Sequence, residues 1–174
     1  SSLSEGDQRR VLPAMAKFLR SRCRKVLQNG QYDNFVLSYT YGCFISNIRH
    51  DTMVGSWEIY PELPRALATQ LSLWTDIPYY KDERESESVA VKHAYCCTDS
   101  AGTKELAETQ RKQMENNPGM QRHFAFNMAL LPGIMYLQLR GIRYWATRAK
   151  EHWHVTQLEI VQVEKDLDAI VNKD

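Results

Sequence analysis

Long hydrophobic runs are missing from this sequence of 174 residues. The nearest approach to one lies between Phe124 and Leu139, and Asn127, Pro132 and Gln138 interrupt it. Because a helix needs roughly 20 predominantly apolar residues to cross a bilayer, this segment is too short and too polar for that role. The pattern predicts a buried helix, with a membrane-embedded segment as the alternative.

Motifs with recognisable chemistry are also missing. The chain has no GxSxG, Walker A or GxGxxG motif and no CxxC or HxxxH pair. Thiol chemistry by Cys97 with His93 is the one catalytic alternative, and no oxyanion-hole motif accompanies it. His152 and His154 point about 200° apart on a helix and cannot share a metal ion. The sequence therefore predicts a protein that is not an enzyme, with no cofactor, no metal ion and no small-molecule substrate.

Cysteine is scarce and charge is balanced. A chain of this length buries a core without disulfides, so the four cysteines predict reduced thiols and an intracellular, reducing compartment. The 22 basic and 21 acidic residues leave a net charge of +1, which favours neither nucleic acid nor membrane. The chain begins with Ser1, which fits either trimming or removal of a leader; the second option suggests a mitochondrial protein.

Apolar residues at helical spacing occupy most of the chain. Segments 13–28 and 32–48, joined by Asn29-Gly30, predict an N-terminal αα-hairpin. A short helix over 64–74 and a polar helix over 103–116 follow. We therefore expect a mainly α fold, an irregular helical domain that spans residues 1–174 and ends in a long C-terminal helix.

The C-terminal third has a heptad repeat, in which apolar residues alternate at spacings of three and four. The repeat comprises Leu139, Ile142, Ala146, Ala149, Trp153, Thr156, Ile160, Val163, Leu167 and Ile170. It predicts a helix of roughly 35 residues, about 50 Å long. Since Pro132-Gly133 precedes it, we expect residues 119–174 to form a kinked and then long helix.

This helix is the predicted partner-binding element. Its first half is basic and its second half is acidic, so an antiparallel partner of the same polarity, either another copy or a different subunit, brings unlike charges together. We expect the front half to pack on the core and the part from Val155 onward to contact a partner. The contact residues are Trp153, Ile160, Val163, Leu167 and Ile170. The predicted function is an accessory or structural subunit of a larger assembly, with a mitochondrial complex as a candidate for that assembly.

A basic N-terminal segment supports a different hypothesis. Between Gln8 and Gln28 there are seven basic residues and no acidic one. On a helix, part of this set forms a face that could bind the phosphates of a nucleic acid, an anionic lipid or an acidic protein surface. The candidate phosphate-binding residues are Lys17, Arg20, Arg22, Arg24 and Lys25.

Overall fold

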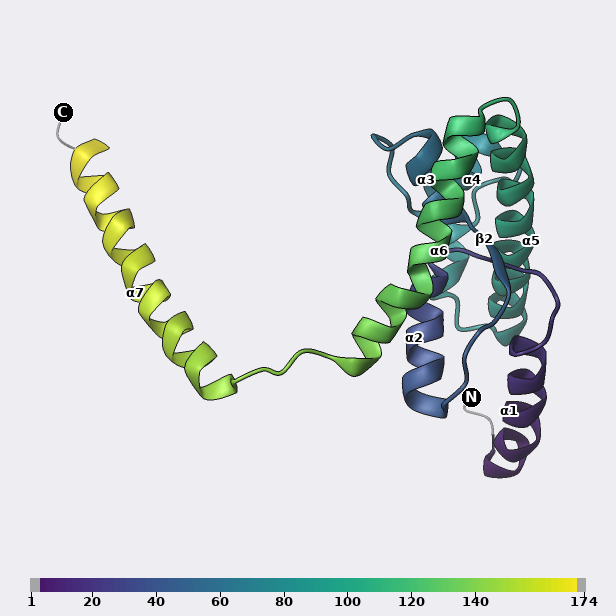
Figure 1. The fold of residues 1–174 in the computed structure, drawn as a ribbon, viewed down its shortest axis with the longest axis horizontal. Helices are drawn as coiled ribbons and strands as arrows, with labels where there is room; N and C mark the ends of the chain where they lie inside the picture. The colour runs from purple at the N-terminus through teal and green to yellow at the C-terminus, as the bar shows by residue number, and fades with distance from the viewer. Residues whose placement is uncertain (1–3, 172–174) are drawn as a thin grey trace. The chain divides into compact units, whose positions relative to one another are not determined.

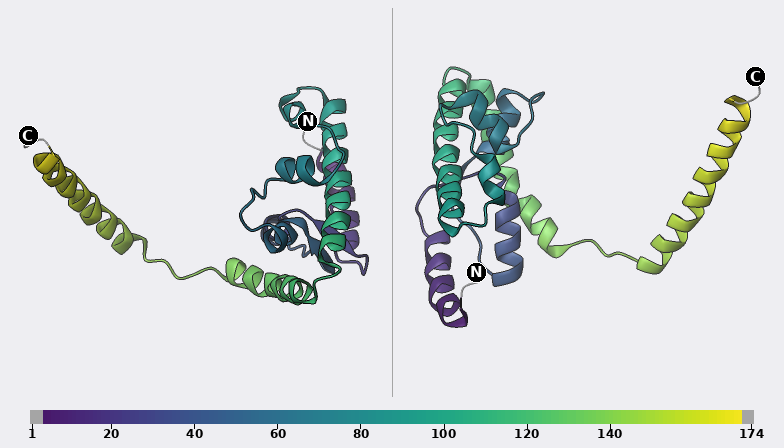
Figure 2. Two further views of the ribbon diagram at one scale, coloured as in Figure 1. Left: turned by 90° about the horizontal axis from the view of Figure 1, so that it is seen from above. Right: turned by 180° about the vertical axis from the view of Figure 1, so that it is seen from behind.

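The computed structural model describes residues 4–171 of the chain and confirms the mainly α class. The chain divides into two compact units, Ser1–Arg140 and Gly141–Asp174. Each unit is described by itself. Figure 1 and Figure 2 show the elements of both.

The first unit contains most of the secondary structure. Its elements are α1 (Glu5–Leu19), β1 (Lys25–Leu27), α2 (Gly30–Tyr41), β2 (Ile48–Asp51), α3 (Thr52–Ile59), α4 (Leu67–Trp74), the 3₁₀ helix η1 (Lys81–Glu85), α5 (Val89–Met114) and α6 (Pro118–Arg140). The second unit contains α7 (Ala146–Val171).

The two N-terminal helices are present, but a strand lies between them. α1 ends at Leu19, and β1 pairs in parallel with β2, with Val26 opposite His50. Because parallel strands require a crossover connection, α2 serves as the crossover of a small β–α–β unit rather than as the second arm of a helical hairpin.

Asp51 connects the β–α–β unit to α3. Its carboxylate accepts hydrogen bonds from the backbone N–H groups of Asn29 and Gly30, at 3.2 and 2.7 Å, where α2 begins. It also accepts from Met53 at 2.9 Å and Val54 at 3.4 Å, in the first turn of α3. One buried carboxylate therefore caps the N-termini of two helices, a position where negative charge is favourable.

The apolar core lies where α4, α5 and η1 meet. Leu71, Tyr80 and Leu106 are buried together there. Gly102 permits close approach, since a Cβ atom at this position would lie 2.8 Å from a methyl group of Leu71. The helix α6 packs on α3 and α2, beside the end of α5 (Figure 1).

The helix predicted over residues 119–174, kinked and then long, is divided by residues 141–145 into two helices, and residues 172–174 lie outside the described part of the chain. Pro132 lies inside α6, where it removes a backbone donor, and Figure 1 shows α6 bending along its length. α6 then ends at Arg140, and Gly141 adopts the left-handed conformation (φ +69°) that is typical of the residue after a helix. Residues 141–145 are not helical, so Leu139 and Ile142 of the heptad series lie outside α7. In the described part of the chain, no helix has the length and apolarity that crossing a membrane requires.

Candidate functional site

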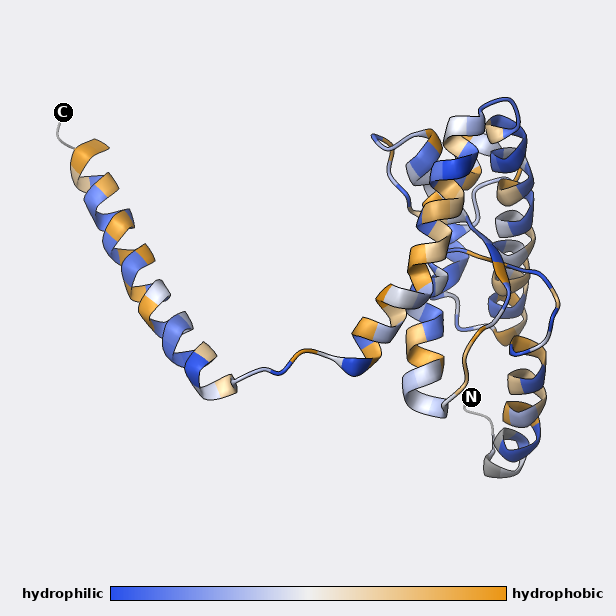
Figure 3. Ribbon diagram, viewed as in Figure 1, coloured by the Kyte–Doolittle hydropathy of each residue, from blue (hydrophilic) through white to orange (hydrophobic). Residues whose placement is uncertain are grey.

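The predicted partner-binding residues form an exposed apolar row on α7. Trp153, Ile160 and Leu167 lie seven residues apart, as do Val163 and Ile170, so all five share one face of the helix. Their exposed fractions lie between 44% and 69%. Over the described residues of the second unit, α7 is the single helix, and no other element of that unit covers the row. Figure 3 shows apolar and polar residues alternating along α7.

The charges of α7 are segregated along its length. Within the helix, the first half carries Arg148 and Lys150 with Glu151, whereas the second half carries four acids with one lysine. This order opposes the helix dipole, which favours acids near the N-terminus, by tenths of a kcal/mol per exposed charge. The segregation therefore does not stabilise the isolated helix.

The structure disperses the predicted phosphate-binding residues. Lys17 lies on α1 and Arg20 follows directly after it, whereas Arg22 and Arg24 lie on the irregular segment before β1. These four side chains are exposed, and the Arg20 guanidinium donates to the backbone oxygen of Gly42 at 2.5 Å. The basic helical face expected over this segment is therefore not formed, because α1 ends at Leu19.

Lys25 is unavailable for phosphate binding. It is 6% exposed, and its ammonium donates to the backbone oxygens of Ser21, Cys23 and Ser46 at 3.0–3.1 Å. Since an ammonium has three hydrogens, these bonds use its full donor capacity. Lys25 holds the loop before β1 against the loop before β2.

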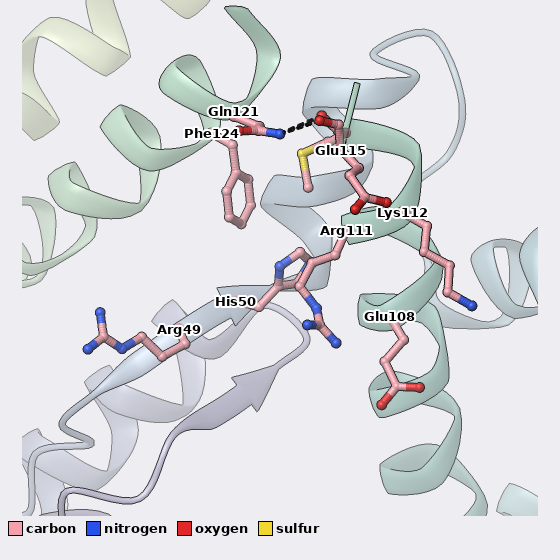
Figure 4. A pocket seen from close by; sticks show the side chains of 9 residues that line it. Arg49, His50, Glu108, Arg111, Lys112, Glu115, Gln121 and Phe124 are labelled. Carbon is pink, nitrogen blue, oxygen red and sulfur yellow. Dashed lines mark hydrogen bonds between the residues drawn. The ribbon is translucent and has the colours of Figure 1, made fainter. Parts of the chain in front are cut away.

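One cavity lined by titratable side chains lies around His50. It has a volume of about 500 Å³ and lies between β2, α5 and the start of α6 (Figure 4). Its walls carry Arg49, Arg111 and Lys112, together with Glu108 and Glu115. In Figure 4 Arg111 lies beside His50, whereas the side chains of Arg49 and Lys112 extend away from it. Recognition of a phosphate requires basic groups that converge on one point. The basic groups of this pocket do not converge.

His50 has a defined tautomer and a lowered pKa. Its Nε2 lies 2.8 Å from the Gln110 side-chain oxygen, which can only accept, so Nε2 carries the proton. The ring is stacked at a tilt on Phe124, with 4.8 Å between centroids. Burial lowers the pKa of His50, and the positive charge of Arg111 acts in the same direction. The neutral imidazole is thereby favoured.

Gln110 centres a buried network of hydrogen bonds. Its amide nitrogen donates to the Thr52 backbone oxygen at 3.0 Å and to Ser56 Oγ at 2.9 Å. Ser56 Oγ in turn lies 2.8 Å from the Gln70 side-chain oxygen. A Cβ atom at Gly55 would overlap the side-chain amide of Gln110, so a larger residue there would displace Gln110 from the network. The network joins α3, α4 and α5 and leaves its own polar atoms satisfied, which is a structural role.

Sequence reasoning missed this network. The signals were present: Asp51 directly before Thr52 is a capping pattern, and Gln110 follows Leu106 by four residues on one face of α5. Neither signal shows that a glutamine is buried, because glutamine is mostly a surface residue.

Apolar hollows flank α6 on two sides. One, of about 520 Å³, lies between α6 and the segment that leads into β2, and includes Phe44, Leu131 and Met135. The other, of about 290 Å³, lies between α6 and α3, and includes Trp57 and Ile134. Residues 124–139 therefore form a helix with apolar surface on both flanks. The prediction of a buried helix is wrong, because Met135 is the one buried residue of α6, and Phe126, Tyr136 and Leu137 are 59–63% exposed.

His93 and Cys97 lie one turn apart on α5, and both side chains are exposed. Cys96 and Cys97 are free thiols exposed on α5. Asp99 lies 2.6 Å from the Lys81 ammonium and accepts from the Tyr80 hydroxyl, so its carboxylate is already paired. Burial and the bond to Asp99 raise the pKa of Tyr80 to about 12. No group of three potential ligands comes together in residues 4–171.

Comparison of the chain with protein-family models, with curated proteins and with solved structures found no match.

Proposed function

We propose that this chain is a non-catalytic accessory or structural subunit of a larger protein assembly and that it docks through α7. The observation that carries the proposal is the exposed apolar row on α7, which its own unit leaves uncovered. Burying such side chains is worth roughly 1.5–3 kcal/mol each, before the cost of association. A partner is the natural source of that burial.

The helix itself also supports docking. Most of the stability of a helix in a protein comes from packing of its amphipathic face, and the described part of the second unit offers α7 no such packing. Ala149 and Ala146 favour the helix, but the β-branched residues of the second half have lower propensity. A partner that packs on the row stabilises both the helix and the assembly.

The alternative of nucleic-acid binding has weaker support. The ammonium of Lys25 is fully used within the fold, and Lys17, Arg20, Arg22 and Arg24 lie on different elements. A mitochondrial location remains a proposal that rests on the basic front of the sequence and its few cysteines.

The test is the mass of the species that contains the chain in its native source, measured by light scattering after size exclusion, with absorbance recorded at 260 and 280 nm. We expect a mass well above the 20.2 kDa of one chain and a protein-like absorbance ratio. Replacement of the wild type by Ile160→Asp/Leu167→Asp should release the chain as a free species, because two charges enter the apolar row.

The matched control is Val155→Asp/Leu158→Asp, which places two charges on other faces of the same helix at similar exposure. We expect it to remain in the large species. A native mass of one chain contradicts the proposal, as does a large species that retains the Ile160→Asp/Leu167→Asp variant. A raised absorbance of this species at 260 nm favours the nucleic-acid alternative.

A further inference from the structure

We propose that the partner of α7 is α7 of a second copy of this chain, paired antiparallel with the two-fold axis at the level of Leu158, whose own side chain faces away from the apolar row. This inference rests on the proposed function, in which α7 is the docking surface. It names the molecule that covers the apolar row. The argument compares which side chains and which charges face each other when two copies of α7 pair antiparallel and when they pair parallel.

Side-chain volumes favour the antiparallel direction. In an antiparallel pair centred on Leu158, each small residue of the front half meets a large residue of the back half. The outer layers are Ala146 with Ile170, Ala149 with Leu167, and Trp153 with Val163. Thr156 with Ile160 forms the central layer. Alternation of small and large residues across facing positions fills the seam evenly, as close packing requires.

Charges beside the seam favour the same direction. In antiparallel pairs the flanking positions of one type face each other across the seam, which brings Lys150 opposite Glu164 of the second copy, and the reverse. On the other flank, His152 faces Asp166. One like pair, Glu159 with Glu159, occurs close to the symmetry axis. Sliding the helices by one heptad brings Glu159 opposite Asp166 instead and leaves Ala146 and Ala149 unpaired.

Parallel pairing neither fills the seam evenly nor brings unlike charges together. It places Ala146 on Ala146 and Ala149 on Ala149, which leaves the front of the seam underfilled, and Trp153 on Trp153 in the same seam. It also brings Glu159 of each copy opposite Glu164 of the other, which is two repulsive contacts and no attractive one. The segregation of charge on α7, which works against the helix dipole, therefore acquires a function in an antiparallel pair.

The test is sedimentation equilibrium of the purified full chain at low salt. We expect a dimer with twice the mass of one 20.2 kDa chain. Lys150→Glu converts both Lys150–Glu164 contacts to repulsion and should weaken the dimer about tenfold. Glu164→Lys should weaken it by a similar factor. The double variant Lys150→Glu/Glu164→Lys restores unlike pairs and should recover the wild-type affinity.

The direction of pairing is decided by the sign of one effect. In a parallel dimer Glu164→Lys removes the repulsion with Glu159 and tightens association, whereas the antiparallel dimer weakens. A tightened dimer overturns the proposal, and so does a double variant that is as weak as the single ones. Circular dichroism of each variant at a concentration where it is monomeric controls for changes in helix content.

Failure of this proposal is distinguishable from failure of the proposed function. If the purified chain is a monomer at all accessible concentrations, while Ile160→Asp/Leu167→Asp still releases it from the native assembly, the second copy is overturned and a different subunit occupies the row. If the variant changes neither species, both proposals fail.

Discussion

The two units of this chain bury their side chains in opposite ways. Among the described residues, nine polar side chains are buried beside eight apolar ones, and all of them belong to the first unit. The second unit has an apolar row on α7, and none of its described residues, 141–171, is buried. The first unit is therefore held together by satisfied hydrogen bonds as much as by apolar contact, whereas the apolar row of α7 is exposed.

The difference has a thermodynamic consequence. A buried hydrogen-bond network makes a fold sensitive to the loss of single partners, because an unsatisfied buried group costs about 1–3 kcal/mol. An exposed amphipathic helix is insensitive to such losses but depends on the concentration of its partner. Substitutions in the buried network should therefore change the stability of the first unit, whereas dilution should change the stability of α7.

The largest expected contrast is in amide hydrogen exchange. At concentrations too low for association, amides of α5 around Leu106 should exchange only through global unfolding, on the order of 10³-fold or more slower than amides of α7. Exchange of the full chain, resolved by peptide mass spectrometry, measures this ratio. Strong protection of α7 at every dilution would show that it packs within its own chain, and would contradict the contrast between a buried first unit and an exposed α7.

The next effect concerns the carboxylate that caps two helices. Asp51→Ala leaves the N–H groups at the start of α2 and α3 without their acceptor and should reduce the free energy of unfolding by about 3–5 kcal/mol. Urea unfolding followed by circular dichroism measures the loss. The control is Asp76→Ala, an exposed aspartate, which should change stability by less than about 0.5 kcal/mol. Equal effects of the two substitutions contradict the assigned role.

The smallest effect is on pH dependence. Because burial lowers the pKa of His50 in the folded chain, the unfolded chain binds this proton more readily. The stabilisation is complete above the ordinary pKa of about 6.5 and is lost as the pH falls below it, by up to about 1.4 kcal/mol per pH unit. His50→Gln, whose amide can still donate to Gln110, should flatten this slope between pH 7.5 and 5.5.

The control for the pH experiment is His154→Gln on α7, where the side chain is exposed. We expect this variant to keep the wild-type slope in urea unfolding. A wild-type slope in His50→Gln, or a flattened slope in His154→Gln, assigns the pH dependence to other groups.

Periodicity predicted the elements better than it predicted their connections. Heptad spacing placed the row from Trp153 to Ile170 on one helical face, and the short helix ending at Trp74 was also expected. The continuation of the heptad back to Leu139 was wrong, since the left-handed Gly141 ends α6. A repeat of apolar residues reports a shared face only where the backbone is helical, and a single glycine can end the helix without disturbing the repeat.

The N-terminal region shows a second limit. Arg20, Arg22 and Arg24 favour a helix by propensity, yet tertiary pairing of β1 with β2 sets the conformation after Leu19. The buried polar network was equally hidden, because Gln70 and Gln110 are buried only when their partners converge from distant segments. Contacts of this kind depend on the fold as a whole and have no local pattern.

The position of Asp51 also bears on the order in which the chain folds. The contact of Asp51 with Gly30 closes a segment of 21 residues, whereas the contact of His50 with Gln110 closes one of 60. Loop-closure entropy makes the longer contact about 1 kcal/mol more expensive to form from the unfolded chain. We therefore expect the β–α–β unit to form first as a local nucleus, on which α5 then assembles.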